Sequence, residues 1–277
     1  MIDAHQHFWR PDRGDYGWME GADPIIRRDY LPDDLAPVLR RFGVSGTVLV
    51  QAAPTLAETE FMLGLADEHA FILGVVGWLD FEAENFPADL ARLKMRPKLA
   101  GLRPMLQDLD DDQWILRPAV LDALARLADD GIAFDILALP RHLPFVAEAL
   151  ERTPGLRAVV DHLAKPPVAS GVMEPWKTNI SRLAAMPNVY CKLSGLISEA
   201  SHDAWSVSDL VSYVDHAAAA FGADRLMWGS DWPVCRLAGE YGDVLTAAML
   251  SLPPAMRADP GIFGANAQRF YRLHMPR

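Results

Sequence analysis

The sequence alternates eight short apolar segments with eight amphipathic segments, and this alternation restricts the fold more than any other feature. The apolar segments are rich in Val, Ile, Leu and aromatic residues, as strands buried on both faces are. They span residues 2–8, 46–52, 72–80, 99–106, 133–139, 157–164, 188–196 and 226–233. The amphipathic spacing predicts helices over residues 33–42, 56–69, 87–96, 118–130, 143–152, 178–186, 208–221 and 241–252.

This order predicts an α/β protein with a (β/α)8 TIM barrel. Eight parallel strands that are each followed by a helix close into a barrel of about 250 residues. The 277 residues therefore fit one domain over 1–277. An open doubly wound sheet is the alternative, but it usually has fewer strands and a Gly-rich first turn. The active site of a barrel lies at the carboxyl ends of its strands, so inward-facing polar residues there are the candidates.

Composition narrows the choice of partners. Half of the residues are hydrophobic (51%) and the formal net charge is -11, which argues against nucleic acid and anionic membrane surfaces as partners. No segment reaches the roughly 18 apolar residues of a membrane span. The two cysteines, Cys191 and Cys235, fit no zinc spacing, and we expect free thiols rather than a disulfide. We expect a cytoplasmic monomer or homodimer that acts on a small molecule.

The first predicted strand carries two histidines, His5 and His7, separated by one residue. Alternate residues of a strand share a face, so both imidazoles point into the barrel near its catalytic end. Two imidazoles on one face make half of a metal site. The alternative is a pair of hydrogen-bonded core histidines, and the position on the first strand of a barrel favours the ligand pair.

The last predicted strand ends at Asp231, before Trp232 and Pro233. A carboxylate at an otherwise apolar strand end must be paired, hydrogen-bonded or catalytic. Because the last strand of a closed barrel neighbours the first, Asp231 can face His5 and His7. A loop-capping aspartate is the simpler alternative.

A third imidazole is expected from the sixth strand, which carries Asp161 and His162. Only one of two neighbouring strand residues points inward. We favour His162, which completes a set of three histidines and one aspartate or binds the substrate carbonyl. If Asp161 points inward instead, His162 faces the helices.

Several further side chains are predicted to bind substrate. Arg103 lies within an apolar strand, where it meets either an anion or carbonyl of the substrate or a buried carboxylate. Gln51 and Lys192 occupy strand positions whose side chains should point into the barrel, as expected of pocket residues. Trp78 ends the third strand. The loop that begins at Trp9 also contains Tyr16 and Trp18, and it is a candidate lid. Exposed loop aromatics without a binding role are the alternative.

These motifs resemble the amidohydrolase-2 branch of the amidohydrolase superfamily, and in particular its sugar-lactone hydrolases. The resemblance rests on residues 3–9 (DAHQHFW), 161–162 (DH), 191–196 (CKLSGL) and 229–233 (GSDWP), and it extends over essentially the whole chain. It implies a distorted TIM barrel with the site at the strand ends.

Residue by residue, the resemblance implies a role for each matching position. His5 and His7 match the metal-binding histidines of the first strand, and His162 matches the histidine of the sixth. Asp231 matches the aspartate that activates water and can also bind metal, and Arg103 matches an arginine that contacts substrate.

The sequence departs from the two-metal members of this superfamily. Those members have a carboxylated lysine or a glutamate at the end of strand four and a histidine at the end of strand five. Here Arg103 occupies strand four, and the fifth segment, residues 133–139, contains no histidine. We therefore expect one divalent metal, with zinc favoured, and activity without metal is the alternative.

The resemblance and the polar residues together predict hydrolysis of a sugar aldonolactone, such as L-fuconolactone or L-rhamnonolactone. Asp231 and His162 are the predicted catalytic residues. A muconolactone-type lactone and a metal-dependent decarboxylation are the chemical alternatives. A non-catalytic barrel that only binds a small molecule is the alternative from another class, and it has no need of this cluster of carboxylate and imidazoles.

Overall fold

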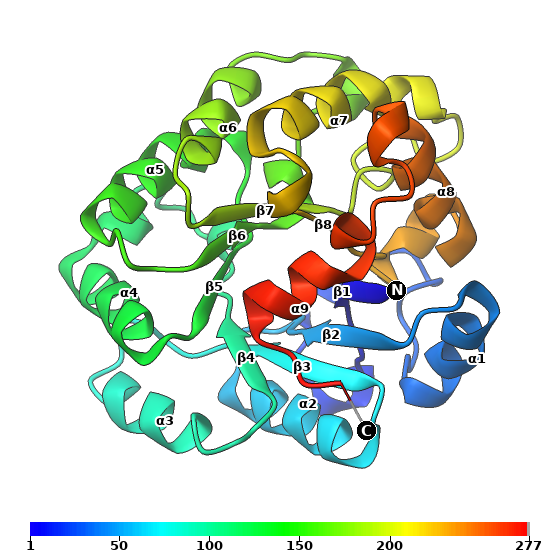
Figure 1. Ribbon diagram of the computed structural model, residues 1–277. Helices are drawn as coiled ribbons and strands as arrows, with labels where there is room; N and C mark the ends of the chain where they lie inside the picture. Colours follow the sequence, from blue (N-terminus) through cyan, green and yellow to red (C-terminus); the bar gives the residue numbers. More distant parts are fainter. Residues whose placement is uncertain (276–277) are drawn as a thin grey trace.

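The computed structural model describes residues 1–275, and within them eight parallel strands form one sheet in chain order. A parallel bridge between Gln6 and Trp232 brings the last strand back to the first and closes the sheet. The strands surround one axis and the helices surround the strands (Figure 1). The predicted (β/α)8 barrel is confirmed. The strands are β1 (Ile2–Gln6), β2 (Gly46–Val50), β3 (Ile72–Gly77), β4 (Leu99–Leu102), β5 (Ala133–Ile136), β6 (Ala158–Val160), β7 (Val189–Leu193) and β8 (Leu226–Trp228).

Eight of the helices follow the strands and match the predicted segments to within a few residues. They are α1 (Pro32–Phe42), α2 (Leu56–Glu68), α3 (Phe86–Leu93), α4 (Pro118–Asp130), α5 (Leu143–Arg152), α6 (Trp176–Ala184), α7 (Val207–Phe221) and α8 (Tyr241–Ser251). Gly43 and Gly131 end two of them in the left-handed conformation that glycine adopts without strain. No helix in the described part of the chain is long and apolar enough to cross a bilayer.

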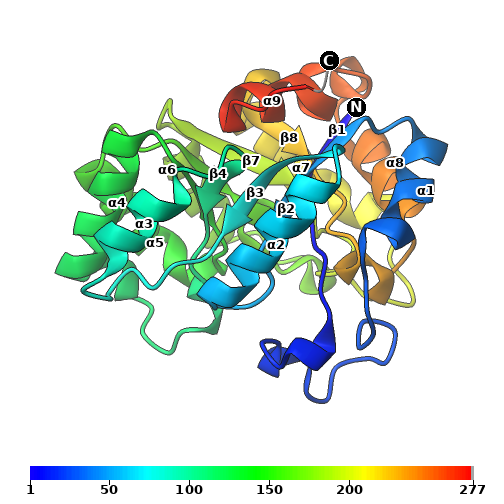
Figure 2. The ribbon, with the colours of Figure 1, turned by 90° about the horizontal axis from the view of Figure 1, so that it is seen from below.

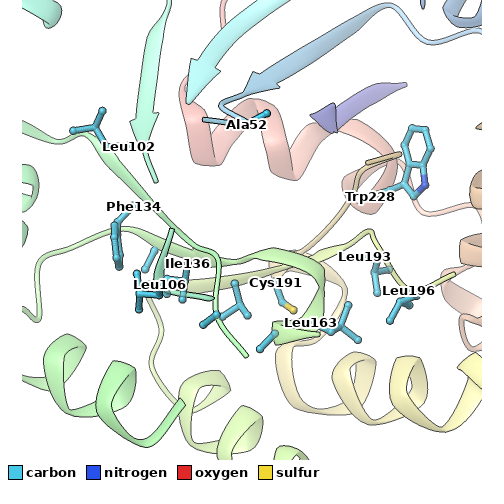
Figure 3. Packing of buried hydrophobic residues seen from close by; sticks show 14 of the residues in the cluster. Ala52, Leu102, Leu106, Phe134, Ile136, Leu163, Cys191, Leu193, Leu196 and Trp228 are labelled. Atoms are coloured by element: carbon cyan, nitrogen blue, oxygen red, sulfur yellow. The ribbon is translucent and has the colours of Figure 1, made fainter. Parts of the chain in front are cut away.

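Two apolar layers hold the barrel together. The larger layer fills the space between strands and helices, and Figure 3 shows Cys191 and Leu193 of β7 in it. Both cysteines are buried and unpaired in the described chain, as expected for free thiols. The smaller layer lies inside the barrel and contains Ala4, Val48, Val76, Ala133, Val159 and Met227.

A ninth helix, α9 (Asn266–Tyr271), closes one end of the barrel. Phe270 and Tyr271 of this helix belong to the inner apolar layer. Figure 1 shows α9 across the barrel end near the amino terminus, and Figure 2 shows the loop after β1 projecting from the opposite side. The inner layer and α9 therefore fill the barrel from its amino-terminal side, and the carboxyl ends of the strands remain open.

Candidate active site

Three polar side chains from β1 and the segment after β8 meet at the open end of the barrel. The Nε2 atoms of His5 and His7 are 3.2 Å apart, and His7 Nε2 is 3.2 Å from Asp231 Oδ1. Backbone hydrogen bonds fix this meeting, since Asp231 N donates to His5 O at 2.8 Å and His7 N donates to Trp232 O at 2.7 Å. The two ends of the barrel sheet thus present an acid and two imidazoles to one space.

Asp3 locks the two sheet ends together, and the sequence patterns did not reveal it. Its Oδ1 accepts from the backbone N–H groups of His5 and Ser230 at 3.1 and 2.9 Å. The hydroxyl of Tyr241 donates to its Oδ2 at 3.0 Å. Burial raises the pKa of Asp3 to about 6 against the effect of these hydrogen bonds. Asp3 therefore positions both sides of the site without lining the cavity described below.

The sixth strand differs from the prediction. It ends at Val160, and residues His162 to Lys165 all have positive φ angles of 50–58°. Because strand alternation stops at Asp161, both Asp161 and His162 face the barrel interior, where the strand rule allowed only one. His162 Nδ1 lies 2.8 Å from Ser194 Oγ, and its Nε2 lies 3.9 Å from Asp231 Oδ1. A Cβ on Gly195 would lie 2.7 Å from the His162 ring, so this close approach requires glycine.

Arg103 follows β4 and is held by Asp161, the buried carboxylate that the sequence allowed as a partner, and by Gln51. Its Nη1 donates to Asp161 Oδ2 at 3.0 Å, which is a buried ion pair. Its Nε and Nη2 donate to Gln51 Oε1 at 3.2 and 2.8 Å, and Nη2 also donates to Gln51 O. The guanidinium nevertheless lines the cavity, so one face of its fixed charge is open to a bound molecule.

Lys192 lies below the site, fully buried in a charged network. Its Nζ donates to Asp135, lies 2.9 Å from Asp161 Oδ1 and lies 3.1 Å from His5 Nδ1. Tyr271 OH, from α9, donates to Asp135 Oδ2 at 2.6 Å. Burial raises the pKa of Asp135 to about 6, partly offset by Lys192. The network ties the catalytic end of the barrel to the closing helix.

The open end of the barrel holds a cavity of about 340 Å³. Its polar lining is His7, Arg103, Gln107, Asp108, His162, Lys165 and Asp231. Its apolar lining is Trp9, Trp18, Ala52, Met105, Leu137 and Val234.

The cavity separates the predicted substrate-binding residues into two groups. Arg103 and Trp9 line the cavity. Gln51 and Lys192 lie behind this lining, where Gln51 accepts hydrogen bonds from Arg103 and Lys192 contacts His5. Trp78 lies outside the lining, and its backbone is bonded to the Thr59 hydroxyl of α2. The sequence patterns missed Gln107, Asp108 and Lys165, which lie in a short helical turn after β4 and at the end of the turn after β6, where no periodic pattern marks them.

The loop after β1 covers one side of the cavity with tryptophans. Trp9 is fully buried and stacks on His7 with ring centroids 6.2 Å apart. Trp18 remains partly exposed, and its Nε1 donates to Ala52 O at 2.7 Å. These contacts place Trp9 and Trp18 of this loop beside the site, and the role of the loop as a lid stays a prediction.

A buried carboxylate, Glu58, supports the loop that carries Ala52. Its oxygens accept from the backbone N–H groups of Ala52 at 3.1 Å and of Ala53 at 2.6 Å. Burial raises the pKa of Glu58 to about 7, although these hydrogen bonds and Tyr16 oppose the shift.

Glu58 should make stability depend on pH. Its pKa is raised from 4.5 to about 7 on folding, so its contribution is full below about pH 4.5 and is lost as pH rises through 7. The unfolding free energy of the wild type relative to Glu58→Gln should fall by about 2–3 kcal/mol between pH 5 and pH 8. Urea unfolding at several pH values measures this, with Glu68→Gln on the exposed face of α2 as the control. A difference that stays constant across this range contradicts the expectation.

The surroundings of the site favour the ionised form of Asp231 and the neutral forms of His162 and His5. Burial opposes ionisation of Asp231, but the surrounding histidines hold the pKa of this carboxyl below its ordinary value. Burial lowers the pKa of His162 to about 4, and that of His5 well below its ordinary value. Near neutral pH Asp231 is therefore an ionised carboxylate beside the neutral imidazoles of His5 and His162.

The donor atoms fit a divalent metal. One ligand atom from each of His5, His162 and Asp231 lies within 4.8 Å of the others, and all three residues are buried. His7 Nδ1 lies 2.7 Å from Val50 O, so it carries the proton and leaves Nε2 free to bind. Two or three imidazoles with one carboxylate are a donor set that divalent transition metals accept.

The fold and this cluster are those of an amidohydrolase, and the comparison with known families agrees. The family model for amidohydrolases matches residues 2–273, and the chain belongs to this family.

Individual relatives are similar over nearly their full length. An L-fucono-1,5-lactonase of Burkholderia ambifaria is 46% identical and the match covers 99% of this chain and 96% of that protein. An L-fucono-1,5-lactonase of Burkholderia multivorans is 38% identical and the match covers 99% and 97%. A crystal structure of a Burkholderia multivorans amidohydrolase with bound zinc is 36% identical, has a TM-score of 0.92, and the match covers 99% of both chains. The resemblance inferred from the sequence motifs is confirmed.

Proposed function

We propose that the protein hydrolyses a sugar lactone and that Asp231 activates the attacking water. The observation that carries the proposal is the ionised carboxylate of Asp231 in one cavity with the guanidinium of Arg103. The similarity to two L-fucono-1,5-lactonases, at 46% and 38% identity, supports this class of substrate. Within the class, L-fuconolactone and L-rhamnonolactone are the proposed candidates.

In the first step Asp231 Oδ1 accepts a proton from water as the water oxygen attacks the lactone carbonyl carbon. The carbonyl oxygen becomes an oxyanion. Arg103 stabilises it, because its charge is held in place by Asp161 and Gln51 before the reaction begins. His162 stays neutral, since its pKa is lowered to about 4, and it orients the water or the carbonyl beside Asp231.

In the second step the tetrahedral carbon expels the ring oxygen and re-forms the carbonyl. The proton that Asp231 received passes to the ring oxygen, which leaves as a hydroxyl group. Water and lactone are thus converted to one hydroxy acid, and Asp231 returns to the carboxylate form. No covalent intermediate with the protein is required.

We propose zinc as the divalent metal that His5, His7, His162 and Asp231 hold. When bound, a divalent metal supplies Lewis-acid polarisation of the carbonyl and lowers the pKa of a coordinated water. Replacing His162 by asparagine should weaken zinc binding about 10-fold or more, because it removes an imidazole ligand. Asparagine tolerates the left-handed backbone at this position (φ 52°), so the change adds little strain.

Competition with a chromophoric chelator measures the zinc affinity. The exposed His202 offers a control, His202→Asn, which should bind zinc as the wild type does. Equal affinities of His162→Asn and the wild type would contradict the assignment of His162 as a ligand.

A pH-indicator assay across a lactone panel tests the proposed function. We expect turnover of L-fuconolactone or L-rhamnonolactone with release of one proton per ring opened. Turnover restricted to a muconolactone, release of carbon dioxide from an aromatic acid, or ligand binding without turnover would each overturn the proposal in favour of another function. The cytoplasmic location and the monomeric or homodimeric state stay predictions.

A further inference from the structure

Three polar residues line the cavity but have no part in the hydrolytic steps. Gln107 and Asp108 belong to the short helix η3 (Leu106–Asp108) after β4, and Lys165 follows the turn after β6. They share the cavity with Arg103 and Asp231. A lactone whose carbonyl lies at Arg103 and Asp231 therefore has the rest of its ring within reach of these three side chains.

The backbone that carries Lys165 is strained. His162, Leu163, Ala164 and Lys165 are consecutive non-glycine residues with φ angles of 50–58°. The left-handed conformation costs such residues roughly 1–2 kcal/mol each, and it persists at functional sites where the surroundings enforce it. The turn places both His162 and Lys165 on the cavity, and Glu199 Oε1 holds the Lys165 ammonium at 3.2 Å.

The Gln107 side chain contains an unused acceptor. Its Oε1 is buried and has no hydrogen-bond partner among the described residues. Its backbone is fixed, because Gln107 N donates to Leu137 O at 3.2 Å. A buried acceptor without a partner is costly, and a rotation of the side-chain amide toward the cavity that Gln107 lines would let a bound molecule supply the missing donor.

We propose that Gln107, Asp108 and Lys165 form a subsite that recognises the ring hydroxyl groups of a polyhydroxylated lactone. This inference rests on the proposed function and identifies the residues that select the substrate. Ring hydroxyls donate to the Asp108 carboxylate, one accepts from the Lys165 ammonium, and Gln107 lines the cavity beside them. The apolar lining, including Trp9 and Met105, receives the C–H faces of the ring.

Two substrates separate recognition from chemistry. L-fuconolactone has ring hydroxyls, whereas δ-valerolactone has the same reactive ester and none. Asp108→Asn and Lys165→Met should each lower kcat/KM for L-fuconolactone about 10-fold or more. Both variants should leave kcat/KM for δ-valerolactone within about twofold of the wild type, because no partner is lost. Asp110→Asn and Lys177→Met change exposed residues outside the cavity lining and serve as controls.

The outcomes are distinct. A selective loss on L-fuconolactone supports the subsite. An equal loss on both lactones, or no loss on either, overturns the subsite and leaves the proposed function intact when the wild type hydrolyses L-fuconolactone. A wild type that hydrolyses no lactone overturns both. Thermal unfolding of each variant shows whether a loss common to both lactones comes from misfolding.

Discussion

Replacing Asp231 by asparagine should lower kcat/KM for the lactone about a thousandfold, the largest effect expected from any substitution in the site. The change removes the group that takes the proton from water and returns it to the ring oxygen, and such groups contribute about 10²–10⁴-fold to rate. Asparagine has the same shape, and it tolerates the left-handed backbone of Asp231 (φ 56°). The loss should therefore be chemical rather than structural.

The matched control for this experiment is Asp215→Asn, which removes an equal charge from the exposed face of α7. Its kcat/KM should equal that of the wild type within about twofold. Steady-state kinetics with L-fuconolactone and thermal unfolding of both variants complete the measurement. A folded Asp231→Asn protein with near wild-type kcat/KM would remove Asp231 from the mechanism.

The sequence predicted the barrel and the meeting of its ends because both follow from simple periodicity. The eight apolar segments are buried strands, and the period of two in β1 places His5 and His7 together. Closure of the sheet then brings Asp231 to them, with His7 Nε2 and Asp231 Oδ1 3.2 Å apart. The barrel, the pairing of the two histidines and the approach of Asp231 all follow from regular backbone geometry, and the periodic pattern of residue types in a sequence predicts such geometry.

Features that depend on irregular backbone were not predictable in this way. Strand alternation allowed either Asp161 or His162 to point inward, but the left-handed turn after Val160 turns both inward. The same turn carries Lys165 to the cavity, and no periodic pattern marks it. Helix α9 was missed because it has only six residues and no neighbouring strand that requires it.

The alternation of strand residues predicts whether a side chain points into the barrel, but it does not predict how far along the barrel axis that side chain lies. Lys192 has the predicted inward direction, yet it lies below the cavity and pairs with Asp135 and Asp161. Trp78 follows the end of β3 but stays outside the cavity lining. A residue's height along the barrel axis depends on strand lengths and register shifts, such as the one between Asp3 and Gln6.

Replacing Arg103 by lysine should lower kcat/KM for the lactone about a hundredfold, mainly through kcat. Lysine keeps the positive charge but loses the planar fork that binds Asp161 and Gln51 at once, so the charge is no longer fixed at the oxyanion. Arg103 acts through its fixed charge, and loss of one preorganised electrostatic group at an oxyanion costs about 10²–10³-fold in kcat. Because lysine still pairs with the buried Asp161, the variant avoids leaving that carboxylate uncompensated.

Arg152→Lys is the control, since Arg152 makes its ion pair with Glu148 at the surface. It should change kcat/KM by no more than about twofold. The decisive measurement is whether the folded Arg103→Lys protein has a lower kcat, a higher KM, or both. If only KM rises, the guanidinium binds the ground state and the transition state equally, and the oxyanion must be stabilised by another group in the cavity.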